Sequence, residues 1–194
     1  MRITVTALAF FSCFWIAYGE SMSFEGMALE PGISINGATV PIGGNGIKDS
    51  PVVMKVGEIT LQPSKFGFVS IAVVPQVIFR NLVLIVNKTT PQKDSWAISL
   101  LEFMKKERLV DQAVIQGFEL QNNTTDELPV VKSRAGKFFP SRGQITLEGV
   151  VIRDENGDQS IQTAIIWLEG PTAGYLVWQG DQGPRFLKLM GSVF

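Results

Sequence analysis

The stretch from Gln144 to Gly170 constrains the fold more than any other part of the chain. Two runs rich in β-branched residues flank Asn156-Gly157, a dipeptide typical of a two-residue β-hairpin turn, because both turn residues need a positive φ. The turn fixes which residues of the two runs lie opposite one another. The expected pairs are Glu155 with Asp158, Ile152 with Ile161, and Ile145 with Leu168.

This register predicts apolar side chains on both faces of the hairpin. One face carries Ile145, Leu147, Val151, Ala164, Ile166 and Leu168. The other carries Val150, Ile152, Ile161, Ile165 and Trp167, diluted by Thr146, Glu148 and Thr163. Neither face is simply polar, so the pattern does not predict a sheet with one side in water. Either further layers cover both faces, or one face is reserved for an apolar ligand.

The N-terminus has the pattern of a secretory signal peptide. Arg2 precedes an uncharged run from Ile3 to Tyr18, and Ala17-Tyr18-Gly19 is a cleavage site with small residues at its first and third positions. We predict cleavage after Gly19, with a retained N-terminal anchor as the alternative. Residues 20–194 are then enough for a single β-rich domain and too few for two large ones.

Export without disulfides is the next expectation. The only cysteine, Cys13, lies inside the predicted signal peptide. Secreted eukaryotic domains commonly use disulfides, so this pattern favours the bacterial periplasm or cell envelope. With 17 basic and 18 acidic residues the chain has no charge excess that would indicate a nucleic-acid partner.

Histidine is absent, which removes Ser-His-Asp and Cys-His catalysis and nearly all zinc sites. Carboxylate chemistry remains, but no spacing pairs Asp94, Glu102, Asp154 and Asp158 as catalytic acids and bases. The segment from Asp154 to Asp158 resembles the start of a calcium loop. The glycine and the glutamate such a loop requires are Gln159 and Ile165 here, so a tight turn is favoured. We predict no enzyme activity, cofactor or metal.

The remaining pattern predicts a mainly β fold with one amphipathic helix. The apolar stripe of the helix packs on the sheet or, alternatively, lies on a membrane. Strands are expected on both sides of this helix, joined as an antiparallel meander that forms a jelly roll, a taco-like groove or a sandwich. The predicted strands span residues 52–61, 66–74, 76–86, 110–120, 175–179 and 185–190, and the helix spans residues 94–108.

A basic and aromatic segment runs from Lys132 to Arg142, with Phe138-Phe139 at its centre and no acidic residue. Such a segment can bind an anionic headgroup, a glycan phosphate or single-stranded nucleic acid. The favoured interpretation is a solvated connection that tucks the two phenylalanines beneath it.

The C-terminal pattern GQITLEGVVIRDENGDQSIQTAIIWLEGPTAGYLVWQG resembles the repeat of the envelope lipid-transport jelly rolls of the Lpt type. The earlier segments VGEITLQPSKF, VIFRNLVLIVN and LVDQAVIQGFELQN are similar to AsmA-like proteins. Both groups form β-grooves whose apolar interior shields acyl chains. The resemblance therefore implies a lipid-binding groove and carries over no catalytic residue.

Two functions follow as expectations. The first is an exported, non-enzymatic β-groove protein that binds or passes lipid or acyl chains in the cell envelope. The second is an exported β-sandwich that binds a protein or glycan partner. The candidate ligand-binding residues are Val150, Ile152, Ile165, Trp167, Trp178, Lys137, Phe138 and Phe139.

Overall fold

A computed structural model describes residues 23–24, 27–28, 34–44, 46–63, 75–87, 96–106, 113–122, 129–155 and 157–189. The predicted signal peptide lies outside these residues, as does the predicted strand at 66–74. The described part is mainly β with one α-helix, which confirms the predicted fold class. None of its helices is long and apolar enough to cross a bilayer.

Nine strands form one sheet, and a short separate hairpin precedes it. The separate hairpin is β1 (Ser23–Phe24) and β2 (Met27–Ala28). The sheet strands are β3 (Ser34–Ile42), β4 (Val52–Pro63), β5 (Pro75–Val86), β6 (Ala113–Asn122), β7 (Val130–Phe139), β8 (Gln144–Asp154), β9 (Gly157–Trp167), β10 (Tyr175–Gly180) and β11 (Gly183–Lys188). Helix α2 (Trp96–Lys106) separates β5 from β6, and the 3-10 turn η1 (Pro140–Arg142) separates β7 from β8.

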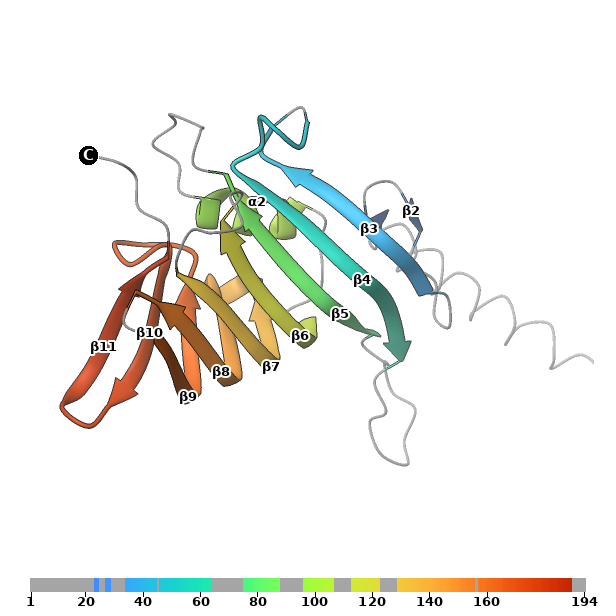
Figure 1. Cartoon of the computed structure of the whole chain (residues 1–194). Helices are drawn as coiled ribbons and strands as arrows, with labels where there is room; N and C mark the ends of the chain where they lie inside the picture. The colour runs from blue at the N-terminus through green and yellow to red at the C-terminus, as the bar shows by residue number, and fades with distance from the viewer. Residues whose placement is uncertain are drawn as a thin grey trace, which may run out of the picture.

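The strands lie in chain order from β3 to β11, as Figure 1 shows. All neighbouring pairs are antiparallel except β5 and β6, which are parallel. A parallel pair needs a crossover connection, and α2 lies within it. The predicted meander is therefore correct on both sides of the helix but is interrupted at that point.

Helix α2 touches both edge strands of the sheet, just beyond the last residue of each. The Nε1–H of Trp96, in its first turn, donates a hydrogen bond of 3.1 Å to the carbonyl of Leu189, just after β11. Ser99 packs beside Gly43, just after β3, because a Cβ added to Gly43 would lie 3.1 Å from the Ser99 Oγ. Since β3 and β11 are the two edge strands, the open sheet must curl until its edges converge on the helix.

A row of interrupted pairing crosses the sheet from β3 to β9. At one position in each strand the regular register skips a partner, and these positions lie opposite one another. We call them the bulge row: Gly37, Gly57, Asn81, Gly117, Arg134, Gly149 and Gln162. Four of its members, on β3, β5, β6 and β8, have a positive φ. Each skipped residue faces one skipped residue of the next strand, so the register continues unchanged across the row. Glycine kinks at aligned positions introduce curvature into a sheet, which accounts for the curl.

The bulge row also changes which residues face inward. On β8 the buried residues are Ile145, Leu147, Val150 and Ile152, so the step across Gly149 is three residues instead of two. The same step occurs on β4, β5 and β6, where it separates Val56 from Ile59, Phe79 from Leu82 and Ile115 from Phe118. Each strand thus keeps its apolar side chains on one side of the sheet despite the interruption.

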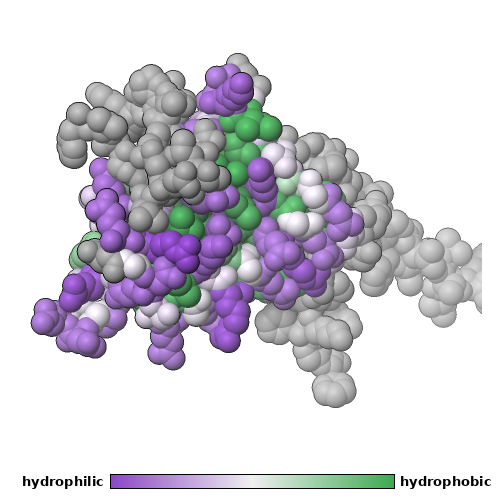
Figure 2. Space-filling view, viewed as in Figure 1, coloured by the Kyte–Doolittle hydropathy of each residue, from purple (hydrophilic) through white to green (hydrophobic). Residues whose placement is uncertain are grey.

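These side chains form a single core with the helix. Trp96, Ala97, Leu100, Leu101 and Met104 of α2 belong to the same apolar cluster as the strand residues, so we call this side the inner face. The buried strand residues of the cluster are at most 4 % exposed. Hydrophilic side chains dominate the side of the molecule seen in Figure 2.

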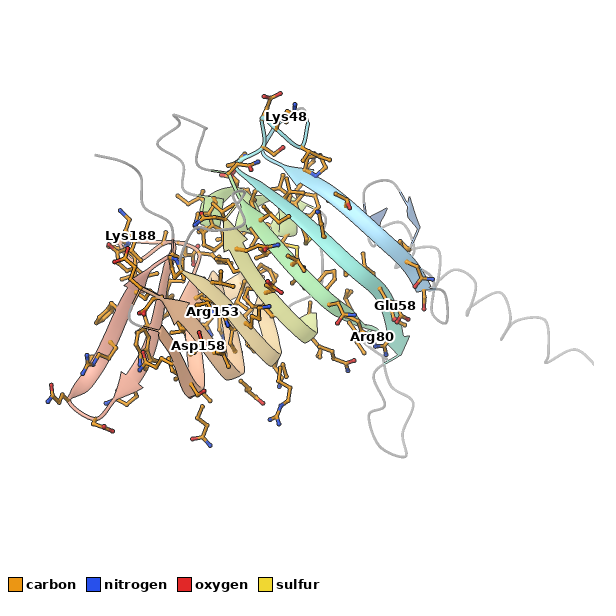
Figure 3. The ribbon with its side chains drawn as sticks, in the orientation of Figure 1. Lys48, Glu58, Arg80, Arg153, Asp158 and Lys188 are labelled. Carbon is orange, nitrogen blue, oxygen red and sulfur yellow. The ribbon has the colours of Figure 1, made fainter. Side chains whose placement is uncertain are left out.

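A polar network supports the outer side of the bulge row. Glu58 accepts hydrogen bonds from Ser34 (2.9 Å) and Thr60 (3.0 Å), and pairs with Arg80 at 2.8 Å. The Nε–H of Arg80 then donates to Gln116 at 3.0 Å. Each of these charged or amide side chains is next to a member of the bulge row in the sequence: Glu58 to Gly57, Arg80 to Asn81 and Gln116 to Gly117. The network therefore links β3 to β6 at the point where the strand pairing is interrupted. Figure 3 shows Glu58 and Arg80 side by side.

The hairpin of β8 and β9 forms, but the predicted register is wrong by two residues. Asp154 pairs with Gly157 and Ile145 pairs with Ile166, so residues 155 and 156 make the connection. A shift of two preserves the side on which each residue points, since side chains alternate with a period of two.

The predicted assignment of residues to the two faces of the hairpin is also wrong. The step at Gly149 turns Val151 outward, where it is 38 % exposed, and turns Val150 and Ile152 inward, where each is 1 % exposed. One side of the hairpin is therefore core, and the other is in contact with water over most of β9.

The basic segment from Lys132 to Arg142 is not the solvated connection that was favoured. It forms most of β7 and η1, and β7 pairs with β6 on one side and β8 on the other. Side chains therefore alternate along it: Phe138 is 2 % exposed, whereas Lys137 is exposed. Pro75 is the first residue of β5 and pairs with Pro63.

The bulge row generates a stability prediction. Gly149 has a φ of 62°, a conformation that β-branched residues rarely adopt, although a Cβ there would meet the Arg134 side chain only at 3.5 Å. Gly149→Val should therefore reduce the free energy of unfolding by about 1–3 kcal/mol through backbone strain alone. Thermal denaturation would show a melting temperature several degrees lower.

Gln162→Val is the matched control, because Gln162 is the row position opposite Gly149, is exposed and has no positive φ. Valine is favourable in a strand, so this change should leave the melting temperature nearly unaltered. Equal melting temperatures for the two variants would mean that the stability of the bulge row does not require a residue that tolerates a positive φ at position 149.

Candidate interaction surface

The structure separates the predicted ligand-binding residues into two groups. Val150, Ile152 and Phe138 are buried in the core, at 1 to 2 % exposure. Trp178 is half-buried and packs against the same cluster from β10. These four side chains stabilise the fold, and none of them presents an open apolar surface.

The other predicted residues come together on the outer face. Trp167 lies between the buried Ile166 and Leu168 on the chain, so it points away from the core. Phe139 points outward for the same reason, because Phe138 points inward. Both residues lie opposite Gln144 of β8, one from each side. Ile165 and Lys137 lie opposite Thr146 in the same way.

Strands β10 and β11 extend this surface. Val177 pairs with Ile165 on one side and with Phe186 on the other, so three apolar side chains adjoin across three strands. Phe186 is 57 % exposed, one of the most exposed large apolar side chains of the described residues. Tyr175 is on the same face as Val177. We call this surface the outer patch: Phe139, Ile165, Trp167, Tyr175, Val177 and Phe186.

Cationic side chains border the outer patch where it approaches α2. Lys137 of β7 lies opposite Thr146 of β8, which lies opposite Ile165 of β9 on its other side. Ile165 in turn pairs with Val177 of β10. The guanidinium carbon of Arg142 lies 5.2 Å from the centre of the Phe139 ring, within the range of a cation–π interaction. Arg142 belongs to η1, which contacts α2. Lys105 of α2 is 3.5 Å from Glu169, at the same end of the sheet.

Four carboxylates of the described part are held in ion pairs: Glu58, Glu119, Asp158 and Glu169. Hydrogen bonds from Ser34, Arg80 and Thr60 lower the pKa of Glu58. The pKa of Asp158 is lowered chiefly by hydrogen bonds from Arg153, at 2.8 and 3.1 Å. Figure 3 shows these two side chains turned toward each other. No cluster of three metal-binding side chains occurs within the described ranges.

The carboxylates weighed for catalysis lie on separate elements within the described residues. Glu102 is exposed on α2, whereas Asp154 and Asp158 belong to the β8–β9 hairpin. Asp94 lies outside the described residues. Two hydrogen bonds from Arg153 hold the Asp158 carboxylate.

Three members of the outer patch were missed by the sequence-based prediction: Tyr175, Val177 and Phe186. Alternation with the buried Leu176 places the first two on one face, a signal that was available. Phe186 could be assigned only from its pairing with Val177, which depends on a turn that contains Asp181-Gln182.

Comparison of the chain with models of known protein families finds no match, and no curated protein matches its sequence.

The Arg153–Asp158 pair gives a pH prediction. Arg153→Gln removes both charge-assisted hydrogen bonds, so the pKa of Asp158 should rise toward its ordinary value. Because the folded pKa is lowered, the pair stabilises the protein above the ordinary aspartate pKa. This contribution is lost as the pH falls through the lowered value. An NMR titration of the side-chain carboxyl carbons measures the change.

Glu58 is the internal control, since its hydrogen-bond partners are all far from the hairpin in the sheet. Its pKa should be the same in both proteins, and calcium should move neither resonance. A calcium-dependent shift at Asp158 would contradict the turn interpretation and indicate a metal site in the hairpin.

Proposed function

We propose that the protein is an exported, non-enzymatic lipid-binding protein of the cell envelope that contacts lipid through its outer patch. The observation that supports this proposal is the grouping of four aromatic and two branched aliphatic side chains on the water-facing side of β7, β9, β10 and β11. Export is inferred from the signal-peptide pattern of residues 1–19.

The inner face is a poor candidate for the lipid site. An open groove would leave the side chains of its wall accessible, but Leu84, Ile115 and Ile152 are each at most 1 % exposed. Placing an acyl chain among them would require side chains to leave a packed core. Protein interiors are packed as densely as organic crystals, so such an exchange is costly.

The composition of the outer patch suits a lipid surface. Trp167 and Tyr175 combine an apolar ring with a polar group, and such residues concentrate at the boundary between hydrocarbon and water. Phe186, with more than half of its surface exposed, supplies apolar area that water does not favour. The curl of the sheet presents these side chains outward and away from the core.

A protein partner is the second candidate. Aromatic side chains are enriched at the centres of protein interfaces, and the outer patch has the required mixture of apolar centre and polar border. Such a partner would bind the face of the sheet rather than its edges. Both edge strands contain a proline, Pro41 in β3 and Pro184 in β11, which discourages the addition of another strand.

The proposal is tested by fluorescence with phospholipid vesicles whose acyl chains carry bromine, a short-range quencher of tryptophan. Trp167 should be quenched because it lies on the outer patch. Trp96, which is 5 % exposed, and Trp178, which packs against the core, should be quenched little. Trp167→Phe should therefore abolish most of the quenching while preserving binding.

Sedimentation with vesicles measures the apolar contribution. Phe186→Ser should weaken binding by about tenfold or more, since full burial of such a ring contributes about 1.5–3 kcal/mol. Ile47→Ser is the matched control, because Ile47 is also 57 % exposed but lies in the loop between β3 and β4. Failure of the unchanged protein to bind any vesicle would refute lipid binding and leave the protein partner as the remaining candidate.

A further inference from the structure

The cations that border the outer patch come from several elements that converge at one end of the sheet. Lys137 is on β7, Arg142 on η1, Lys188 on β11, and Lys105 and Lys106 on the last turn of α2. The contact of α2 with η1 and the pairing of Lys188 with Tyr175 place these elements next to the aromatic end of the outer patch. They are separated along the chain and are brought together only by the fold.

Two of these cations are positioned with the aromatic residues. Arg142 lies over the Phe139 ring, at 5.2 Å from its centre. Lys137 is two residues before Phe139 and therefore on the same face of β7. Both side chains are exposed. The pair thus holds two positive charges at the border of an apolar surface, where a ligand with an apolar part and an anionic part can contact both.

Two exposed carboxylates lie on or beside the elements of this border, Glu102 on α2 and Glu169 just after β9. Glu169 forms an ion pair with Lys105, at 3.5 Å. Its side chain lies directly against Gly143, the residue after η1, because a Cβ on Gly143 would collide with it. Glu148 is also exposed, and it lies beside the bulge row rather than at the η1 end. Three other carboxylates, Glu58, Glu119 and Asp158, are paired with Arg80, Lys132 and Arg153.

We infer that the outer patch docks on an anionic membrane surface, with Lys137 and Arg142 contacting phosphate groups of the lipid headgroups. This inference rests on the proposed function and adds the charge class of the lipid. The aromatic side chains occupy the boundary between headgroups and hydrocarbon, and the cations at their border reach the phosphates beside it. Guanidinium and ammonium groups both form charge-assisted hydrogen bonds to phosphate oxygens.

The test compares vesicles of neutral phosphatidylcholine with vesicles that contain anionic phosphatidylglycerol, again by sedimentation. Each basic residue near an anionic surface strengthens binding about fivefold at low salt. Lys137→Gln and Arg142→Gln should each weaken binding to the anionic vesicles by about that factor, and the double variant by about 25-fold if the contributions add. Binding to neutral vesicles should change little, and added salt should reduce the difference.

Lys48→Gln is the matched control. It removes the same charge from the loop between β3 and β4, which is not part of the outer patch, and Figure 3 shows Lys48 well apart from Lys188. Its binding to anionic vesicles should equal that of the unchanged protein. An equal loss for Lys48→Gln and Lys137→Gln would overturn the inference, because it would show a general charge effect. Thermal denaturation should show unchanged melting temperatures for all these variants.

The results distinguish a failure of the headgroup assignment from a failure of lipid binding itself. Equal binding to neutral and anionic vesicles would overturn the headgroup assignment while leaving lipid binding intact. Binding to neither would refute both. Glycerol phosphate, added as a soluble competitor at millimolar concentration, should not displace the protein from vesicles, because it lacks acyl chains. Complete displacement would identify a small phosphate ligand in place of a membrane surface.

Discussion

The bulge row is the constraint on which the rest of this structure depends. Seven strands interrupt their pairing at positions that lie opposite one another, and four of these positions have a positive φ. A single bulge bends one strand, whereas an aligned row bends the whole sheet. The bend brings the two edge strands to the same helix, so that an 11-residue helix contacts the chain just after both β3 and β11.

The same row controls the division between core and surface. If each strand alternated regularly throughout its length, half of it would turn its apolar side chains to water. The skipped position in each strand corrects this, because the buried residues on its two sides are three positions apart instead of two. Asn81 has the role that glycine has elsewhere in the row, and its side chain fills the space beside Gly57 and Gly117. The polar network around Arg80 adds hydrogen bonds on the outer side.

This arrangement leaves the C-terminal strands with an unusual outer face. Near the bulge row the outer residues are mostly polar or charged, but beyond it β7 and β9 to β11 present aromatic and aliphatic side chains. The proposed contact with lipid depends on this difference. The side chains of the inner face are already buried against one another, whereas Phe186 and Trp167 keep apolar surface in contact with water. The cations at the border of the patch are supplied by α2 and η1 as well as by the sheet, so the surface depends on the curl that brings these elements together.

The sequence by itself determined the class of fold, the hairpin and the helix. Alternating β-branched residues, the turn residues between them and one apolar stripe with helical spacing are local signals. They predicted the β8–β9 hairpin, helix α2 and the strands β4 and β5 on the other side of the helix. Local pattern also predicted Trp167, Ile165 and Phe139 as ligand-binding residues. It could not distinguish them from Val150 and Ile152, because a bulge changes the facing of every residue beyond it and Gly149 looks like any other glycine in a strand.

The tertiary structure alone decided the register, the inner face and the outer patch. The hairpin register depended on whether the turn used residues 155–156 or 156–157, a choice settled by pairing along eleven residues of each strand rather than by the turn dipeptide. The alignment of the bulge row across seven strands is likewise a relation between residues far apart in sequence. Pairing energy between strands is non-local, so no window of the chain contains it, and which apolar residues face water follows from that pairing.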